Sequence, residues 1–163
     1  MERNLYLNKL IRKKNNGLIK VITGIRRSGK TYLLFELFYD YLIKSGVDKD
    51  HIIKIALDDR INKKYRDPDI LCEYVHDVVK DDQIYYVLLD EVQMVSEFED
   101  VLNSFLHMKN VDTYVTGSNA KFLSKDIITE FRGRGDQVHL FPLSFAEYMS
   151  GKGKIGRASC RER

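Results

Sequence analysis

The sequence predicts a three-layer α/β fold with a mainly parallel sheet, and three observations lead to that prediction. Apolar runs of strand length alternate with stretches whose apolar residues recur at helical spacing. A glycine-rich turn, residues 24–31, lies between the first such strand and the helix after it. A later strand, residues 84–91, is continuously apolar until it ends in Asp90 and Glu91, which is typical of a strand buried on both faces.

Size and composition indicate one globular domain and exclude several classes of protein. The chain has 163 residues, of which 44% are hydrophobic, enough for one real core. The apolar runs are too short to span a membrane, and the N-terminus has no secretory segment. A formal charge of +3, scattered along the chain, is too small to indicate a nucleic-acid partner. The two cysteines, Cys72 and Cys160, have no metal-binding spacing, so we expect a reducing, cytoplasmic location.

The first third of the chain contains the glycine-rich turn and the elements around it. Residues 3–14 read as an amphipathic helix, followed by a buried strand at 18–23. The turn, Gly24 to Thr31, has the pattern G-x-x-x-x-G-K-T, and a core-facing helix follows from about residue 30 to 44. This strand, loop and helix context is the one in which the pattern binds phosphate.

The chemistry of the loop follows from its backbone and from two side chains. Glycines let successive N–H groups surround a polyphosphate, and the helix N-terminus adds unpaired donors. Lys30 would reach the β- and γ-phosphates, and the Thr31 hydroxyl would bind Mg²⁺. The residues that we expect to contact the nucleotide are Gly24, Ile25, Arg26, Arg27, Ser28, Gly29, Lys30, Thr31 and Tyr32.

The second strand and the elements after it give weaker signals. Residues 51–57 form a strand, 60–68 read as a polar loop, and a helix runs from about 68 to 80 with Pro68 in its first turn. The stretch 62–65 superficially resembles a guanine-specificity motif but lacks its aspartate, which argues against a GTPase.

Two acids end the third strand, where parallel sheets bind ligands. Asp90 can hold the water shell of Mg²⁺ opposite Thr31. Glu91 can orient and deprotonate a water that attacks the γ-phosphate. Ser96 and Glu99 then predict a capping box at the start of the next helix.

The fourth strand, residues 111–116, also ends in polar residues. Asn119 is our first choice for a side chain that senses the γ-phosphate, and Ser118 is the second. A helix at 120–131 and a glycine-flanked pair, Arg132 and Arg134, precede a fifth strand at 137–141. The two arginines either stabilise the transition state or are solvated loop residues. Another helix begins at Pro142.

Four stretches of the chain form a recognisable combination: residues 24–31, 88–93 (LLDEVQ), 116–120 (TGSNA) and 141–148 (FPLSFAEY). Together they resemble a prokaryotic family of AAA-superfamily ATP-binding proteins, whose ATPase domain is followed by a C-terminal domain of poorly known function. The resemblance implies a P-loop NTPase sheet of order 5-1-4-3-2 and an ATP and Mg²⁺ site with Lys30, Thr31, Asp90 and Glu91 in the roles above. It also implies Asn119 as the first sensor and Arg134 as an arginine finger, which would act on a neighbouring subunit of a homo-oligomer.

The last nine residues, 155–163, resemble the translation of a common sequencing adapter and show no apolar period. We therefore expect a C-terminally incomplete ATPase domain at 1–154, a non-native tail at 155–163, and a natural chain that continues further. The sequence favours Mg²⁺-dependent ATP hydrolysis. A small-molecule kinase, and a slowly hydrolysing regulatory switch that acts through partners or DNA, stay open as alternatives.

Overall fold

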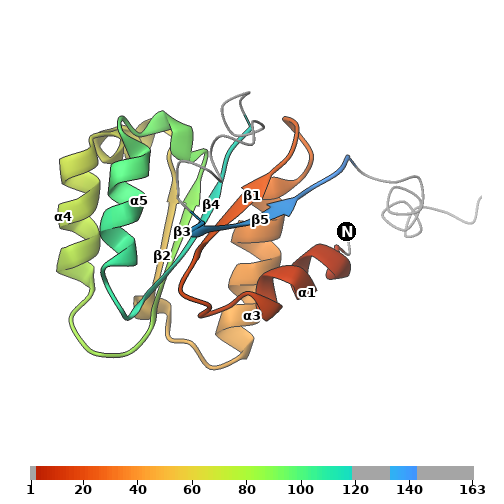
Figure 1. The fold of residues 1–163 in the computed structure, drawn as a ribbon, viewed down its shortest axis with the longest axis horizontal. Helices are drawn as coiled ribbons and strands as arrows, with labels where there is room; N and C mark the ends of the chain where they lie inside the picture. The colour runs from red at the N-terminus through yellow and green to blue at the C-terminus, as the bar shows by residue number, and fades with distance from the viewer. Residues whose placement is uncertain (1–2, 119–132, 143–163) are drawn as a thin grey trace, which may run out of the picture.

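The computed structural model describes residues 3–118 and 133–142, and a five-stranded parallel sheet lies at its centre (Figure 1). The strands are β1 (Ile19–Thr23), β2 (Ile52–Ala56), β3 (Tyr85–Asp90), β4 (Val111–Thr116) and β5 (Gly135–His139). Their order is β2-β3-β4-β1-β5, with all four neighbouring pairs parallel. The predicted fold class and strand order are therefore confirmed.

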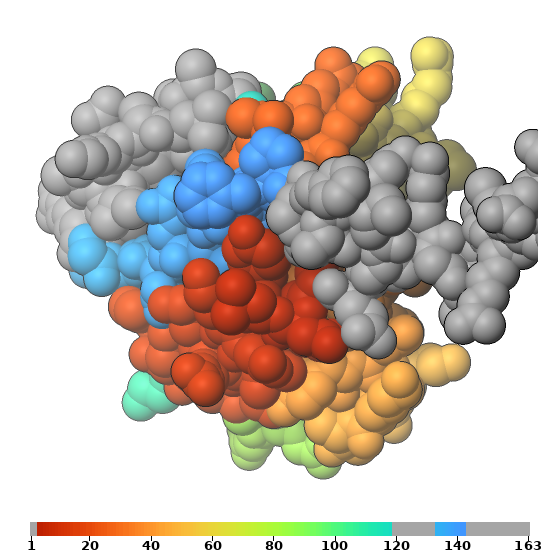
Figure 2. Space-filling view, turned by 90° about the vertical axis from the view of Figure 1, so that its right-hand side faces the viewer, coloured from red at the N-terminus to blue at the C-terminus, as the bar shows by residue number. Residues whose placement is uncertain are grey.

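Helices cover both faces of this sheet, and each face has its own apolar cluster. On one face lie α1 (Asn4–Arg12), α2 (Lys30–Tyr32), the π-helical segment η1 (Leu33–Phe38) and α3 (Tyr39–Lys44). On the other lie α4 (Pro68–Val78) and α5 (Phe98–Leu106), as Figure 1 shows. Figure 2 shows α1, in red, on the surface beside the blue segment that contains β5. The Lys13 ammonium, just after α1, pairs with Asp136 of β5.

The helix predicted at 30–44 is helical throughout but not uniform. Its middle, Leu33–Phe38, forms a π-helix instead of continuing the α-helical hydrogen-bond pattern. The wider turn lets four side chains of this segment enter the core: Leu33, Leu34, Phe35 and Phe38.

Two local predictions are wrong. Residues 60–68 are not a plain loop, because Arg60–Arg66 form a 3-10 helix, η3. At the start of η3 the Asp59 carboxylate accepts the Ile61 N–H. At its end the Arg66 guanidinium donates to the carbonyls of residues 57 and 58.

The predicted capping box is also absent, since the N-cap of α5 is Glu97, in the left-handed region at φ 52°. The N–H of Ser96 donates to the Arg66 carbonyl, so a contact with η3 fixes this residue one position before the cap.

Element ends differ from the predicted ones by a few residues. β5 begins at Gly135 instead of 137, because Gly135 is in register with Ile19 at the start of β1. α1 and α4 end at Arg12 and Val78, earlier than predicted. The predicted helices at 120–131 and from Pro142 on, and the tail at 155–163, lie outside the described residues.

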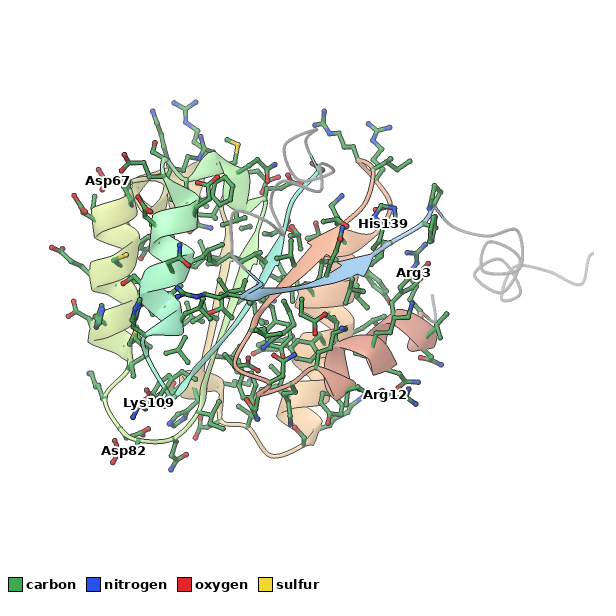
Figure 3. All side chains as sticks on the ribbon, in the orientation of Figure 1. Arg3, Arg12, Asp67, Asp82, Lys109 and His139 are labelled. Atoms are coloured by element: carbon green, nitrogen blue, oxygen red, sulfur yellow. The ribbon has the colours of Figure 1, made fainter. Side chains whose placement is uncertain are left out.

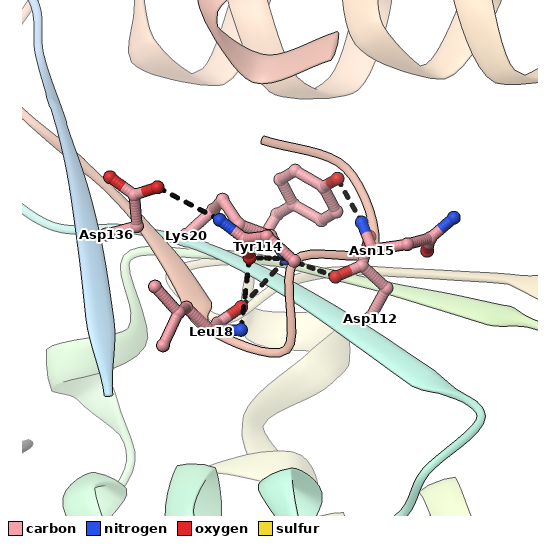
Figure 4. Close-up of polar contacts among 7 residues, drawn as sticks. Asn15, Leu18, Lys20, Asp112, Tyr114 and Asp136 are labelled. Carbon is pink, nitrogen blue, oxygen red and sulfur yellow. Dashed lines mark hydrogen bonds and ion pairs between the residues drawn. The ribbon is translucent and has the colours of Figure 1, made fainter. Parts of the chain in front are cut away.

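A buried ion pair joins β1 and β4 at the end of the sheet where the strands begin, which we call its amino edge (Figure 4). The Lys20 ammonium on β1 donates to Asp112 of β4 and to the Leu18 carbonyl at 2.8 Å. Asp112 also accepts the Tyr114 hydroxyl at 2.9 Å and the Asn15 N–H at 3.0 Å. Lys20 is fully buried and Asp112 is 5% exposed, so each charge is compensated inside the protein.

The two edges of the sheet can be followed in Figure 3. Asp82 and Lys109 mark the edge where β3 and β4 begin, and Asp67 lies at the opposite end, beyond the carboxyl end of β2. None of the helices in the described ranges is long and apolar enough to cross a membrane.

Candidate nucleotide-binding site

The glycine-rich loop joins the carboxyl end of β1 to α2, and its backbone is unusual. Gly24 has φ 151°, Gly29 has φ 87° and Arg27 has φ 65°, values that L side chains rarely adopt. The backbone of Gly24 also lies against the chain after β5: a Cβ there would be 2.6 Å from the Leu140 carbonyl oxygen. Only glycine fits this position.

One polar atom inside the loop provides a test of whether the loop suits a phosphate. The Ser28 side chain is 1% exposed, and its hydroxyl has no hydrogen-bond partner among the described residues. A buried hydroxyl without a partner is costly unless a ligand satisfies it. The concave loop, with this donor and the N-terminus of the following helix, fits an anion. Ile25, Arg26 and Arg27 form the exposed tip of the loop.

The Lys30 ammonium lies inside the loop. It donates to the carbonyls of Gly24 at 3.1 Å and Ile25 at 2.9 Å, and the residue is 4% exposed. Burial lowers the pKa of Lys30, while the nearby carboxylates of Glu91 and Asp90 oppose that shift. The Lys30 ammonium is thus a hydrogen-bond donor close to both Asp90 and Glu91.

Thr31 and Asp90 meet although they are far apart in sequence. The Thr31 hydroxyl donates to Asp90 Oδ2 at 2.8 Å, and the Thr116 hydroxyl donates to Asp90 Oδ1 at 2.5 Å. Both carboxylate oxygens therefore have a donor. Burial raises the pKa of Asp90, and the two threonine hydrogen bonds partly oppose the rise. The arrangement joins the loop to β3 and β4.

Glu91 has a strained backbone and a restrained carboxylate. Its φ and ψ are 55° and 51°, the left-handed region, and its N–H donates to the Thr116 hydroxyl oxygen at 2.9 Å. The Ser118 hydroxyl lies 3.1 and 2.9 Å from its two carboxylate oxygens, and the Gln93 amide donates to one of them. Three neighbours thus set the orientation of this acid.

The remaining predicted residues are not brought to this group of side chains. Tyr32 continues the helix after the loop and is partly buried. Arg134 lies at the opposite edge of the sheet, where its carbonyl accepts the Ile19 N–H at 2.9 Å next to the start of β5. It is therefore far from the loop of its own chain. Asn119 lies outside the described residues.

Sequence reasoning places Ser28 in the loop and Gln93 and Thr116 in stretches that resemble the family, but it assigns no role to these three side chains. The signals for Thr116 are its place in the stretch 116–120 and its position as the last residue of a predicted strand. Within residues 3–118 and 133–142, no group of three or more His, Cys, Asp or Glu could hold a metal ion. A cation here would rely on Thr31, Asp90 and ligand oxygens, which is how Mg²⁺ is often held beside phosphates.

The fold and this site define a P-loop NTPase domain. More specifically, the chain belongs to the AAA domain family, whose sequence profile matches residues 16–149. An uncharacterized protein of Haemophilus influenzae is 33% identical over 153 residues, which are 93% of this chain and 38% of that protein. The uncharacterized protein MJ1544 of Methanocaldococcus jannaschii is 33% identical over 138 residues, 82% of this chain and 29% of its own length. The chain thus spans less than two fifths of either relative.

Solved structures share the fold at low sequence identity. A DNA polymerase III gamma subunit-related protein from Thermotoga maritima superposes with a TM-score of 0.65 at 14% identity, covering 96% of this chain and 51% of that one. AMPPCP-bound DnaA from Aquifex aeolicus superposes with a TM-score of 0.57 at 16% identity, covering 96% and 51%. At such identities the similarity concerns the fold alone.

Proposed function

We propose that this domain binds ATP with Mg²⁺ and hydrolyses the β–γ phosphoanhydride. The observation that carries the proposal is the contact of Thr31 with Asp90 at 2.8 Å, which unites the loop with the acids at the end of β3. Membership of the AAA family supports it, and so does the ATP analogue named for the DnaA neighbour.

Each residue has a task in this proposal. The backbone of Gly24 to Lys30 and the Ser28 hydroxyl hold the phosphates, and Lys30 leaves the loop carbonyls for the β- and γ-phosphate oxygens. Thr31 and Asp90 would hold the Mg²⁺ ion, Asp90 through the water shell of the ion. When bound, Mg-ATP would supply the electrophilic γ-phosphorus and ADP as the leaving group. Glu91 accepts the proton of the attacking water.

Two further roles complete the proposal. Asn119 contacts the γ-phosphate, and Arg134 acts on the site of a neighbouring copy, because it lies at the edge of the sheet opposite its own loop. The domain at 1–154 is then the ATPase part of a longer protein, in agreement with the greater length of both relatives.

One observation favours a second candidate, a slowly hydrolysing switch. Ser118 and Gln93 both donate to the Glu91 carboxylate, so its oxygens are engaged within the protein instead of facing a water molecule. Hydrolysis would then be slow until a partner rearranged these contacts.

The test compares Glu91→Gln with Glu97→Gln in the full chain. Glu97 is a matched control because it is exposed and, like Glu91, has a positive φ. We expect Glu91→Gln to lower the kcat for phosphate release by about 10² to 10⁴ with little change in ATP affinity, and Glu97→Gln to resemble wild type. Equal rates for wild type and Glu91→Gln would contradict the role of Glu91.

Calorimetric titration with an ATP analogue separates the two candidates. ATP binding that is lost in Lys30→Ala, without measurable turnover in wild type, would support the switch. Absence of binding in wild type would contradict both.

A further inference from the structure

Thr116 is a buried residue that links the two acids of the proposed site. It is the last residue of β4, and its side chain is fully buried. β4 lies between β3, which carries the acids, and β1, which leads into the loop. Thr116 is therefore placed centrally at the carboxyl edge of the sheet.

The Thr116 hydroxyl is used twice. As a donor it lies 2.5 Å from Asp90 Oδ1, and as an acceptor it lies 2.9 Å from the Glu91 nitrogen. Since the other oxygen of Asp90 accepts the Thr31 hydroxyl, a chain of three hydrogen bonds runs from the loop to the backbone of Glu91.

This contact bears on the conformation of Glu91. The left-handed region is unfavourable for a non-glycine residue, which persists there only where surrounding contacts determine it. At Glu91 the contact on the backbone N–H is the Thr116 hydroxyl. The direction of the Glu91 side chain depends on this backbone conformation.

We propose that Thr116 is a positioning residue, whose hydroxyl sets the direction of Glu91 and the orientation of the Asp90 carboxylate. The expected effect on kcat rests on the proposed hydrolysis, whereas the expected effect on the Glu91 backbone does not. Valine has the shape of threonine and cannot make either hydrogen bond, whereas serine can make both. Thr113, on the same strand and 3% exposed, lies three residues before Thr116. Because that separation is odd, Thr113 faces the other side of the sheet, and Thr113→Val is a matched control.

The experiment measures two quantities in the full chain. The first is amide hydrogen exchange at Glu91 without nucleotide, and the second is the kcat and KM of ATP hydrolysis. We expect Thr116→Val to speed exchange of the Glu91 amide by about tenfold or more and to lower kcat by about 10- to 100-fold, with KM within about threefold. Thr116→Ser should restore both, and Thr113→Val should change neither.

Several results would overturn the inference. Unchanged exchange and kcat in Thr116→Val would do so, as would a serine variant no better than valine or an equal loss in Thr113→Val. If Thr116→Val does not fold, Thr116→Ala takes its place. Failure of both to fold would assign the hydroxyl to stability and refute a positioning role. If wild type does not hydrolyse ATP, the proposed function fails, and the exchange of the Glu91 amide still decides the role of Thr116.

Discussion

Replacing Gly24 with alanine should weaken nucleotide binding through steric overlap and backbone strain. A Cβ at Gly24 would lie 2.6 Å from the Leu140 carbonyl oxygen and 2.8 Å from the Ser28 hydroxyl oxygen. Ordinary contacts between carbon and oxygen are about 3.3 Å or longer, so the overlap with Leu140 is about 0.7 Å. The Leu140 backbone cannot easily retreat, because its N–H donates to the Thr23 carbonyl at 2.7 Å.

The size of the effect follows from two contributions. Overpacking costs about 1 to 3 kcal/mol, and an L residue at φ 151° adds about 1 to 3 kcal/mol of backbone strain. The sum is about 2 to 6 kcal/mol, which the loop relieves only by leaving its present shape. If about 2 kcal/mol of it opposes the bound shape, the affinity for ATP falls by about 30-fold.

The assay is calorimetric titration with a non-hydrolysable ATP analogue, together with chemical unfolding. Gly46→Ala is the control, since Gly46 has φ 94° but a Cβ at this position would meet no atom within 4 Å. It should lose about 1 to 2 kcal/mol of stability through strain alone and keep the wild-type affinity. A Gly24→Ala protein that binds the analogue as wild type does, with no greater loss of stability than Gly46→Ala, would refute the steric argument.

Two further predictions concern buried charges. Asp112→Asn leaves the buried Lys20 ammonium without its counter-ion and should lower the free energy of unfolding by about 3 kcal/mol, the low end for such pairs because the Leu18 carbonyl remains. The double variant Lys20→Met/Asp112→Leu should lose less stability than the sum of the losses in Lys20→Met and Asp112→Leu. Additive losses in urea unfolding would contradict this prediction. Asp90→Asn should raise the thermal midpoint of the nucleotide-free protein at pH 7. Burial raises the pKa of Asp90 in the folded state, so its ionisation costs stability as pH rises from the unfolded pKa through the folded one. The gain should therefore shrink on acidification, and a gain independent of pH would contradict the assignment to charge.

The polar groups at the two edges of the sheet differ in a way that relates to function. At the amino edge, Lys20 and Asp112 satisfy one another and their neighbours within the protein. At the carboxyl edge, the Ser28 hydroxyl has no partner in the described part of the chain, and Lys30 donates to loop carbonyls. The loop thus brings together a buried hydroxyl without a partner and an ammonium that can exchange carbonyls for a ligand, whereas at the amino edge the His51 Nδ1 atom, before β2, is the only buried side-chain atom that lacks a partner among the described residues.

Much of the fold can be predicted from local pattern. The buried strands are predictable because continuous apolar runs and their polar ends are properties of short stretches, and β4 has the predicted ends. The predicted capping box is wrong because a contact with Arg66, thirty residues earlier in the chain, fixes Ser96. The π-helical segment at Leu33–Phe38 escapes prediction because α- and π-helical turns have nearly the same apolar spacing over so few residues.

The sequence by itself determined which chemical groups this protein has for phosphate: a glycine loop with Lys30 and Thr31, and a strand that ends in Asp90 and Glu91. These depend on residue type and spacing within a few positions. Only the tertiary structure decided that Thr116 lies between the two acids and that Arg134 lies at the far edge, away from the loop of its own chain. Both follow from parallel pairing of β3, β4, β1 and β5, a long-range arrangement that the family resemblance implied but that the residues of no local stretch specify.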